Sequence, residues 1–237
     1  MYCLEDAVKY SELDADGKMS LLSVLNRLQD CCIFDSEELG MGLDFLRQEQ
    51  RAWVLSSWQV VVCRYPKLGE HIRTYTWPYH FKGFLGYRNF KAEDAAGEVV
   101  AYADSIWTYL DTQTGMPARI PKEVQQRYRF DTPYEMNRAG RKIPLEEDMQ
   151  PKEPVRVGRC HIDTNRHVNN GKYVMIAEDY LPADFKVREI RAEYKKAAIL
   201  SDLIYPKVKY QESRVVVSLE NEAAASYAVV EFMEEHV

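Results

Sequence analysis

One order of elements occurs twice along this chain of 237 residues, and this repeat limits the folds open to it more than any other feature. In each half a helical pattern comes first, and segments rich in β-branched and aromatic residues follow it. Two short similarities support the repeat: "KLGEHI" (67–72) with "ILSDLI" (199–204), and "AEDAAGEVVAYA" (92–103) with "ENEAAASYAVVE" (220–231). The offsets are 199 − 67 = 132 and 220 − 92 = 128, so we infer a duplication.

The first half contains the clearest helical pattern. Leu21, Leu25, Leu28 and Cys32 recur at helical spacing over residues 20–34, and the preceding Ser20 can cap the helix. The apolar stripe is broad, which predicts a helix that is buried along one side. We expect a second short helix within 36–48. Strands are predicted at 52–65, 70–79, 84–93 and 98–111.

The second half repeats this order. A helix is predicted over 169–181, where Tyr173, Ile176, Ala177 and Tyr180 have helical spacing. The strands that follow are predicted at 187–198, 203–211, 213–222 and 226–235. A long central helix wrapped by a curved antiparallel sheet, present twice, describes an α+β fold of the tandem (double) hotdog type. We expect a first domain at 1–118, a connector at 119–152 and a second domain at 153–237.

Composition excludes several classes of protein. The formal net charge of −6 argues against general nucleic-acid binding, which needs a basic face. No stretch approaches the roughly 20 apolar residues of a membrane span, and acids stand where a secretion signal would have an apolar run. The five cysteines include no CxxC pair, which is typical of reduced, mostly buried thiols. We therefore expect a soluble, cytoplasmic protein with no membrane partner.

The connector carries a local excess of positive charge. Over residues 119–142 there are seven bases and three acids, a surplus of 7 − 3 = +4. The segment is either a solvated linker or a docking surface for an acidic carrier protein. The bases are Arg119, Lys122, Arg127, Arg129, Arg138, Arg141 and Lys142.

The segment "CHIDTNRHVNNGKY" (160–173) concentrates polar side chains at the start of the second helix. His161, Asp163, Asn165 and His167 alternate, so on an extended segment they would share one face. Two histidines and an acid can bind zinc, but no second cluster supplies a further ligand. The residues can instead cap the helix and satisfy its free N–H groups. A catalytic role is the third interpretation, and it accounts for more of the segment.

The catalytic interpretation starts from the helix end. Unpaired N–H groups and the helix dipole there would polarise a thioester carbonyl, with Val168, Asn169 and Asn170 lying against the substrate. Asp163 could activate a water or attack directly. Asn165 could donate a hydrogen bond, and His167 could orient the acid or transfer a proton. Cys160 alternates to the opposite face, which predicts a core thiol.

At this point the sequence resembles the acyl-acyl carrier protein thioesterases of plants and bacteria. "DTNRHVNNGKY" (163–173) is similar to the signature D-x-N-x-H-V-N-N-x-K-Y of that family. Three further segments resemble the family in the same order: "WVLSSWQVVVCRYPKLGE" (53–70), "RIPKEV" (119–124) and "AEYKK" (192–196). The four matches span nearly the whole chain. The tandem length favours the carrier-protein branch over acyl-CoA thioesterases.

The resemblance implies a function in lipid metabolism. Asp163, Asn165 and His167 match the catalytic Asp, Asn and His of the family. The implied reaction is hydrolysis of fatty acyl thioesters on acyl carrier protein to free fatty acid, which ends fatty acid biosynthesis. We expect no cofactor and no metal, and the implied partner is the carrier protein with its acyl phosphopantetheine arm. The first half would shape the acyl pocket, with Leu25 and Leu28 as candidate substrate-binding residues.

One departure from the family matters. In the plant enzymes a Glu and a Cys, both proposed to act in catalysis, follow L-E-Y-[RK]-[RK], whereas this chain has Ala197 and Ala198. Either Asp163 activates water alone, or the chain only binds acyl groups. An acyl-CoA thioesterase or a hotdog dehydratase would also suit the fold. The plant enzymes also carry a plastid transit segment, and the start of this chain suits a bacterial cytoplasmic form. It could act as a monomer or as a homodimer paired through free sheet edges.

Overall fold

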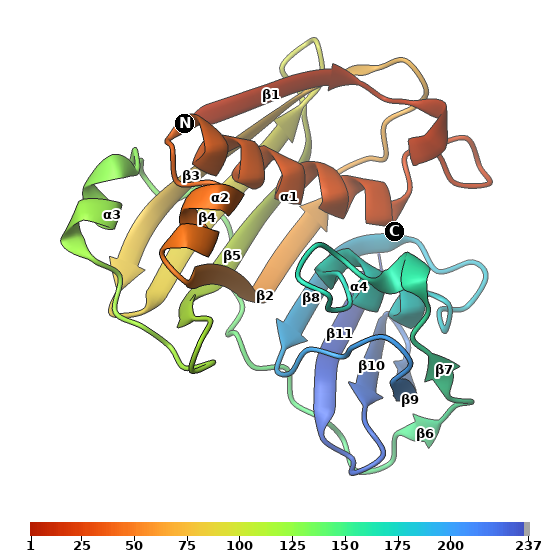
Figure 1. Ribbon diagram of the computed structural model, residues 1–237. Helices are drawn as coiled ribbons and strands as arrows, with labels where there is room; N and C mark the ends of the chain where they lie inside the picture. Colours follow the sequence, from red (N-terminus) through yellow and green to blue (C-terminus); the bar gives the residue numbers. More distant parts are fainter. Residues whose placement is uncertain (235–237) are drawn as a thin grey trace. The chain divides into compact units, whose positions relative to one another are not determined.

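The computed structural model describes residues 1–234, and the chain divides into two compact units (Figure 1). The first unit contains residues 1–56 and 62–138. The second contains residues 57–61 and the described part of the chain from Ala139 onward. None of the helices in this part of the chain is long and apolar enough to cross a membrane.

The first unit is one long helix lying across an antiparallel sheet (Figure 1). Helix α1 (Leu21–Glu38) begins after Ser20, whose hydroxyl accepts a hydrogen bond from the Ser23 N–H at 3.2 Å. The sheet has the strand order β1-β3-β4-β5-β2, and α1 packs on β1 and β3. A short helix α2 (Leu43–Gln48) follows α1. The strands are β1 (Tyr2–Ala7), β2 (Arg51–Val62), β3 (His71–Lys82), β4 (Leu85–Glu93) and β5 (Val99–Asp111).

The second unit repeats this plan with a shorter helix. Helix α4 (Asn170–Glu178) has 9 residues, half of the 18 in α1, and it packs on β10 and β11. The strand order is β8-β11-β10-β9-β6, and Ser57–Val61 of β2 pair antiparallel with β8. The last predicted strand ends at Glu235, which lies outside the described residues. The strands are β6 (Gln150–Pro151), β7 (Val155–Arg156), β8 (Val187–Tyr194), β9 (Leu203–Gln211), β10 (Arg214–Glu220) and β11 (Ser226–Glu234).

The two halves of the chain share one hydrogen-bonded turn, before β3 and before β9, which are each the second strand after the helix of that half. In the first unit the Glu70 N–H donates to the Lys67 carbonyl at 3.1 Å, and the Asp202 N–H donates to the Ile199 carbonyl at 3.1 Å in the second. The acid at the end of each turn also accepts a hydrogen bond from the first amide of the turn. Such matched hydrogen bonds are expected when two segments share one ancestral fold.

The connector is anchored to both units at a few buried residues, while most of its residues are exposed. Helix α3 (Lys122–Arg127) lies between buried Ile120 and Tyr128. The Trp77 indole donates to the Thr132 carbonyl at 2.8 Å, which holds the next residues in the first unit. In the second unit the buried Ile143 donates its N–H to Glu193 Oε2 at 3.2 Å. These contacts use backbone groups that a linker would leave to water.

Candidate active site

The predicted catalytic residues lie on a tight hairpin before α4. Ile162 and Val168 form an isolated β-bridge, and the Asp163 N–H donates to the His167 carbonyl at 2.8 Å. One carboxylate oxygen of Asp163, Oδ1, accepts hydrogen bonds from the N–H groups of Asn165 at 2.8 Å and His167 at 3.3 Å. An Asp that bonds amides further along its own turn is a common way to close such a loop.

The expectation that four side chains share one face of an extended segment is wrong. His161 belongs to the 3₁₀ helix η2 (Arg159–His161), and its Nδ1 accepts a hydrogen bond from the Gly158 N–H at 3.1 Å. Cys160 lies in the same turn and is exposed, so it is not a core thiol. The thiol prediction fails more widely, because only Cys31 and Cys32 are buried.

Asp163, Asn165 and His167 remain together, because the hairpin places them within one turn. Asp163 is half-buried, whereas Asn165 and His167 are exposed. The second carboxylate oxygen of Asp163, Oδ2, makes no hydrogen bond to a described residue. The turn therefore offers one fixed oxygen and one oxygen that can take a proton from water, with an amide and an imidazole beside it.

The start of α4 is capped by its own side chain. Asn169 Oδ1 accepts a hydrogen bond from the Gly171 N–H at 2.9 Å, and the Lys172 N–H donates to the Asn169 carbonyl at 2.9 Å. Asn170 is the first residue of the helix, and Val168 is 3% exposed behind the turn. The N–H groups of Val168, Asn169 and Gly171 thus have acceptors already, and a substrate oxygen that bound the Gly171 N–H would have to replace the Asn169 side chain.

A neighbouring loop, residues 195–202, is joined to the hairpin. The Val168 N–H donates to the Ala198 carbonyl at 2.9 Å, and His167 forms a β-bridge with Ile199. The Tyr173 hydroxyl accepts a hydrogen bond from the Ala198 N–H at 2.7 Å. Burial, which disfavours the phenolate, raises the pKa of Tyr173 to about 12. Helical spacing predicts the place of Tyr173 on the helix. It does not predict the hydrogen bond to Ala198, because the two residues are far apart in the chain.

The departure from the plant pattern falls next to the candidate catalytic turn. Ala198 is fully buried and Ala197 is exposed. Ala198 contacts the turn directly through its carbonyl. Among residues 1–234 no group of three His, Cys, Asp or Glu side chains could hold a metal ion. The polar side chains of this turn include those of Asp163, Asn165 and His167.

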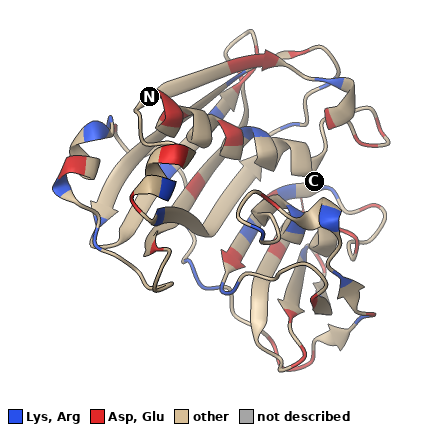
Figure 2. Ribbon diagram, in the orientation of Figure 1, with Lys and Arg blue, Asp and Glu red and all other residues tan. Residues whose placement is uncertain are grey.

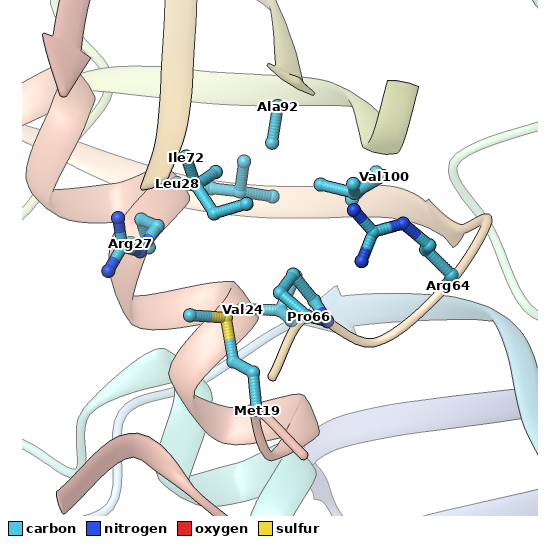
Figure 3. Close-up of a pocket in the computed structure, with 10 residues that line it drawn as sticks. Met19, Val24, Arg27, Leu28, Arg64, Pro66, Ile72, Ala92 and Val100 are labelled. Atoms are coloured by element: carbon cyan, nitrogen blue, oxygen red, sulfur yellow. The ribbon is translucent and has the colours of Figure 1, made fainter. Parts of the chain in front are cut away.

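The first unit contains a pocket under α1 (Figure 3). Its cavity volume is about 10 Å³, room for about one water molecule, and its walls are mainly apolar. Leu28, one of the two predicted substrate-binding residues, lines the pocket, whereas Leu25 is 1% exposed in the core and does not line it. The remaining lining residues are Met19, Val24, Arg27, Arg64, Pro66, Ile72, Ala92, Val100 and Ala101.

Not all of the connector's bases are available for docking. Arg138 forms an ion pair with Asp104 at 3.1 Å and donates to the Tyr134 carbonyl at 2.7 Å. Arg129 forms a more exposed pair with Glu38 at 3.3 Å. Lys and Arg residues occur on α3 beside one acid (Figure 2), and Lys122 on the helix and Arg119 just before it are exposed. The first unit thus offers a small basic surface around α3.

Two family patterns match the chain. Residues 2–128 match the Acyl-ACP thioesterase N-terminal domain, and residues 145–226 match the Acyl-ACP thioesterase C-terminal domain. The chain is 27% identical over 199 residues to a palmitoyl-acyl carrier protein thioesterase, chloroplastic, of Cuphea hookeriana, covering 78% of this chain and 48% of that protein. It is 23% identical over 221 residues to oleoyl-acyl carrier protein thioesterase 1, chloroplastic, of Arabidopsis thaliana. That match covers 83% of this chain and 60% of the Arabidopsis protein. The chain spans about half the length of the curated relatives it matches.

Solved structures match over nearly the whole chain. An acyl-ACP thioesterase from Bacteroides thetaiotaomicron has a TM-score of 0.89 at 21% identity, covering 98% of this chain and 97% of that chain. The 12:0-ACP thioesterase from Umbellularia californica has a TM-score of 0.87 at 18% identity, covering 99% and 96%. At these identities the likeness is one of fold, and the predicted tandem hotdog fold is confirmed.

Proposed function

Because the chain belongs to the acyl-ACP thioesterase family, we propose that it hydrolyses fatty acyl thioesters held on acyl carrier protein. The products are free fatty acid and the carrier protein with its free thiol, so the reaction ends fatty acid synthesis. The observation that carries the proposal is the half-buried Asp163 carboxylate, with one oxygen held by two amides and no hydrogen bond from a described residue to the other.

Asp163 is assigned the role of general base. Its Oδ2 takes a proton from a water molecule, and the water oxygen attacks the carbonyl carbon of the thioester. The carbon–sulfur bond then breaks, and the departing thiolate takes up a proton. Asn165 and His167, on the same turn, hold the water or the carbonyl group. The two hydrogen bonds to Oδ1 support this role because they fix the direction of the free oxygen.

The start of α4 is assigned to the carbonyl oxygen of the substrate. In the free protein the Gly171 N–H donates to the Asn169 side chain. A side-chain amide can rotate away, and the developing oxyanion then accepts the Gly171 N–H in its place. The helix dipole and this N–H both favour negative charge at that point.

The two halves have different roles in the proposal. Residues 153–237 carry the catalytic turn, and residues 1–118 bind the acyl chain, with residues 119–152 as the connector. The apolar pocket under α1 supports the second assignment, since Leu28 lines it. The exposed bases Arg119 and Lys122 support docking of an acidic carrier protein on the first unit.

The cytoplasm is the proposed compartment. All five cysteines are free, including the exposed Cys3 and Cys160. Free exposed thiols are typical of proteins in a reducing compartment. The direct test is the redox state of Cys3 and Cys160 in protein taken from cells, where full reduction is expected and a disulfide would contradict the assignment.

The test of the function is hydrolysis of acyl-ACP by the purified full chain, followed as release of the carrier thiol. Asp163→Asn keeps an oxygen that can accept the two amide hydrogen bonds but cannot act as a base. We expect it to lower the rate by about 10²–10⁴-fold with little effect on folding. Near-native turnover by a folded Asp163→Asn variant would remove the assignment of Asp163.

A non-catalytic acyl-binding protein is the second candidate, and Ala197 and Ala198 are the observation that favours it. The same assay separates the two functions. Binding of acyl-ACP without release of the carrier thiol would establish the binding protein. Equal or faster release from acyl-CoA than from acyl-ACP would identify a CoA thioesterase instead.

A further inference from the structure

A chain of two hydrogen bonds runs from β2 to the start of α4 within the second unit. The Trp58 indole N–H donates to the Tyr194 hydroxyl at 3.2 Å, and that hydroxyl donates to the Asn170 carbonyl at 3.0 Å. Trp58 is 3% exposed and belongs to the part of β2 that lies in the second unit. It pairs with Ala192, two residues before Tyr194, so both side chains share one face of the sheet. The proposed mechanism gives neither residue a role.

The first donor sets the direction of this chain of hydrogen bonds. An indole N–H can only donate, so the Tyr194 oxygen accepts from Trp58 and its single proton is left for Asn170. Burial raises the pKa of Tyr194, which keeps that proton in place. The Asn170 carbonyl is therefore held by a directed hydrogen bond and not by a hydroxyl that is free to rotate.

The group that Tyr194 holds is the other side of the proposed oxyanion donor. The Asn170 carbonyl and the Gly171 N–H belong to one planar peptide group, so a hydrogen bond to the oxygen fixes the direction of the N–H. The same bond polarises the group, which strengthens the N–H as a donor. In the free protein the Gly171 N–H donates to Asn169 Oδ1 at 2.9 Å. In the proposed mechanism Asn169 gives way to the substrate oxygen, and the bond from Tyr194 is the one that stays.

In the first unit a valine takes the place of Tyr194. Val62 and Tyr194 are the last residues of β2 and β8, the first strand after the helix in each half. In both halves the next two N–H groups, of residues 63–64 and 195–196, donate to a single carbonyl of the neighbouring strand. A valine side chain has no hydrogen bond to donate, yet α1 begins with a side-chain cap at Ser20. The start of a helix at this place in the fold therefore does not require a tyrosine, and the half with the candidate catalytic turn has one.

We propose that Trp58 and Tyr194 are positioning residues for thioester hydrolysis, which hold the Asn170–Gly171 peptide group with its N–H directed at the oxyanion. The assignment rests on the proposed function, because it requires the Gly171 N–H to bind the substrate oxygen. A donor that is fixed before the reaction needs no reorganisation when the negative charge develops. The effect is greatest in the transition state, because the carbonyl oxygen of the bound substrate carries much less charge.

The test measures kcat and KM on acyl-ACP for full-length variants that each remove one hydrogen-bonding group. Tyr194→Phe removes the hydroxyl and keeps the ring. We expect kcat to fall roughly tenfold with KM nearly unchanged, a smaller loss than the roughly 10²–10³-fold typical of removing an oxyanion donor itself. Trp58→Phe removes the indole N–H, and we expect kcat to fall about two- to fivefold. In the double variant Trp58→Phe should lower kcat no further, because the indole N–H acts through the hydroxyl.

Tyr210→Phe is the matched control. The Tyr210 hydroxyl donates to the Tyr180 carbonyl at 3.0 Å, just beyond the other end of α4, so the variant removes a bond of the same kind. We expect kcat in this variant to equal that of the unmodified protein. An equal fall of kcat in Tyr210→Phe and Tyr194→Phe would mean that α4 responds to the loss of any such bond, and it would overturn the proposal.

The remaining outcomes separate this proposal from the proposed function. Unchanged kcat in folded Tyr194→Phe would overturn the positioning role, as would a second, equal loss from Trp58→Phe in the double variant. If Tyr194→Phe does not fold, Trp58→Phe carries the test alone, and unchanged kcat in that variant would overturn the proposal. If the unmodified protein hydrolyses no acyl-ACP, or if Asp163→Asn keeps the native rate, the proposed function fails instead, so the two failures are distinguishable.

Discussion

Asp14 and Asp163 make the same set of hydrogen bonds in the two halves of the chain. Asp14 Oδ1 accepts from the N–H groups of Asp16 at 2.9 Å and Lys18 at 3.0 Å, two and four residues further on. Its own N–H donates to the Lys18 carbonyl at 2.7 Å, as that of Asp163 does to His167. The candidate catalytic acid is therefore one copy of a structural turn. The chemistry is assigned to the second copy, where Asn165 and His167 replace Asp16 and Lys18.

This relationship predicts that Asp14→Ala and Asp163→Ala will differ in activity but not in stability. Each removes the acceptor of two exposed amides in an equivalent turn, so each is expected to cost about 0.5–1.5 kcal/mol of unfolding free energy. Only Asp163→Ala should lower turnover of acyl-ACP, by about 10²–10⁴-fold. Urea unfolding and thiol release measured on the same preparations check both parts. Equal loss of turnover in the two variants would mean that the turns act only through folding.

The residues three positions after Asp14 and Asp163 predict a second difference between the two turns, in how a glycine there affects stability. Gly17 has φ 73° and Arg166 has φ 63°, both in the left-handed region. A residue with a Cβ destabilises the folded state by about 1–2 kcal/mol in this region. Glycine avoids that cost but loses more backbone entropy on folding, which offsets roughly half of its advantage. Arg166→Gly is expected to stabilise the protein by up to about 1 kcal/mol. Gly17→Arg should destabilise it by a similar amount, and chemical unfolding of both variants measures the pair. Stabilisation by Gly17→Arg would contradict this account.

Much of the fold could be predicted because its signals are local. The period of Leu21, Leu25 and Leu28 predicts α1, and the β-branched runs predict the strands to within a few residues. The length of α4 could not be predicted, since the apolar pattern continues to Tyr180 while the helix ends at Glu178. Hydrophobic spacing does not reveal where the backbone of a short helix turns away.

The candidate site was harder to predict for a physical reason. Alternation of His161, Asp163, Asn165 and His167 indicates a strand only if the backbone is extended. Here Asp163 bonds its own following amides and closes a turn, and the residue type alone does not decide between these states. The first copy, "DADGK" (14–18), carries the missing signal, because its Asp-Gly pattern is that of a turn.

Tyr173→Phe is expected to destabilise the loop of residues 195–202, next to the candidate catalytic turn. The variant leaves the buried Ala198 N–H without its acceptor, which costs about 1–3 kcal/mol. The pKa of Tyr173 is raised to about 12, above the ordinary value of about 10 in the unfolded chain. Between these values the unfolded chain loses the proton and the folded chain keeps it, so stability falls as pH rises.

The pH dependence gives this variant its own readout. In urea unfolding, the protein should lose more stability between about pH 10 and 12 than the Tyr173→Phe variant does, because phenylalanine has no proton to lose. Near neutral pH, the difference in unfolding free energy between the two proteins measures the cost of the lost hydrogen bond alone. Identical slopes in the two proteins would mean that Tyr173 is not a buried phenol in the folded protein.

The surface around α3 predicts a difference between substrates. Arg119→Glu combined with Lys122→Glu reverses two exposed charges that make no ion pair with a described residue. We expect KM for acyl-ACP to rise several-fold at low salt, while KM for a small acyl-CoA stays the same. The difference should shrink at high salt, where surface charges are screened. The control is Lys18→Glu, which reverses the charge of an exposed base in the turn of Asp14. An equal rise in KM for acyl-ACP in this variant would remove the docking assignment.

Ala197 allows a direct test of whether Asp163 is sufficient as the base. This exposed residue stands where the resemblance places a Glu in the plant enzymes, next to an alanine whose carbonyl accepts a hydrogen bond from the candidate catalytic hairpin. If Asp163 activates water alone, Ala197→Glu should change kcat on acyl-ACP by no more than a few-fold, because the reaction already has its base. Ala197→Gln, of equal size and no charge, controls for added bulk. A rise in kcat of tenfold or more with Glu but not with Gln would mean that this chain lacks a catalytic carboxylate that the reaction needs.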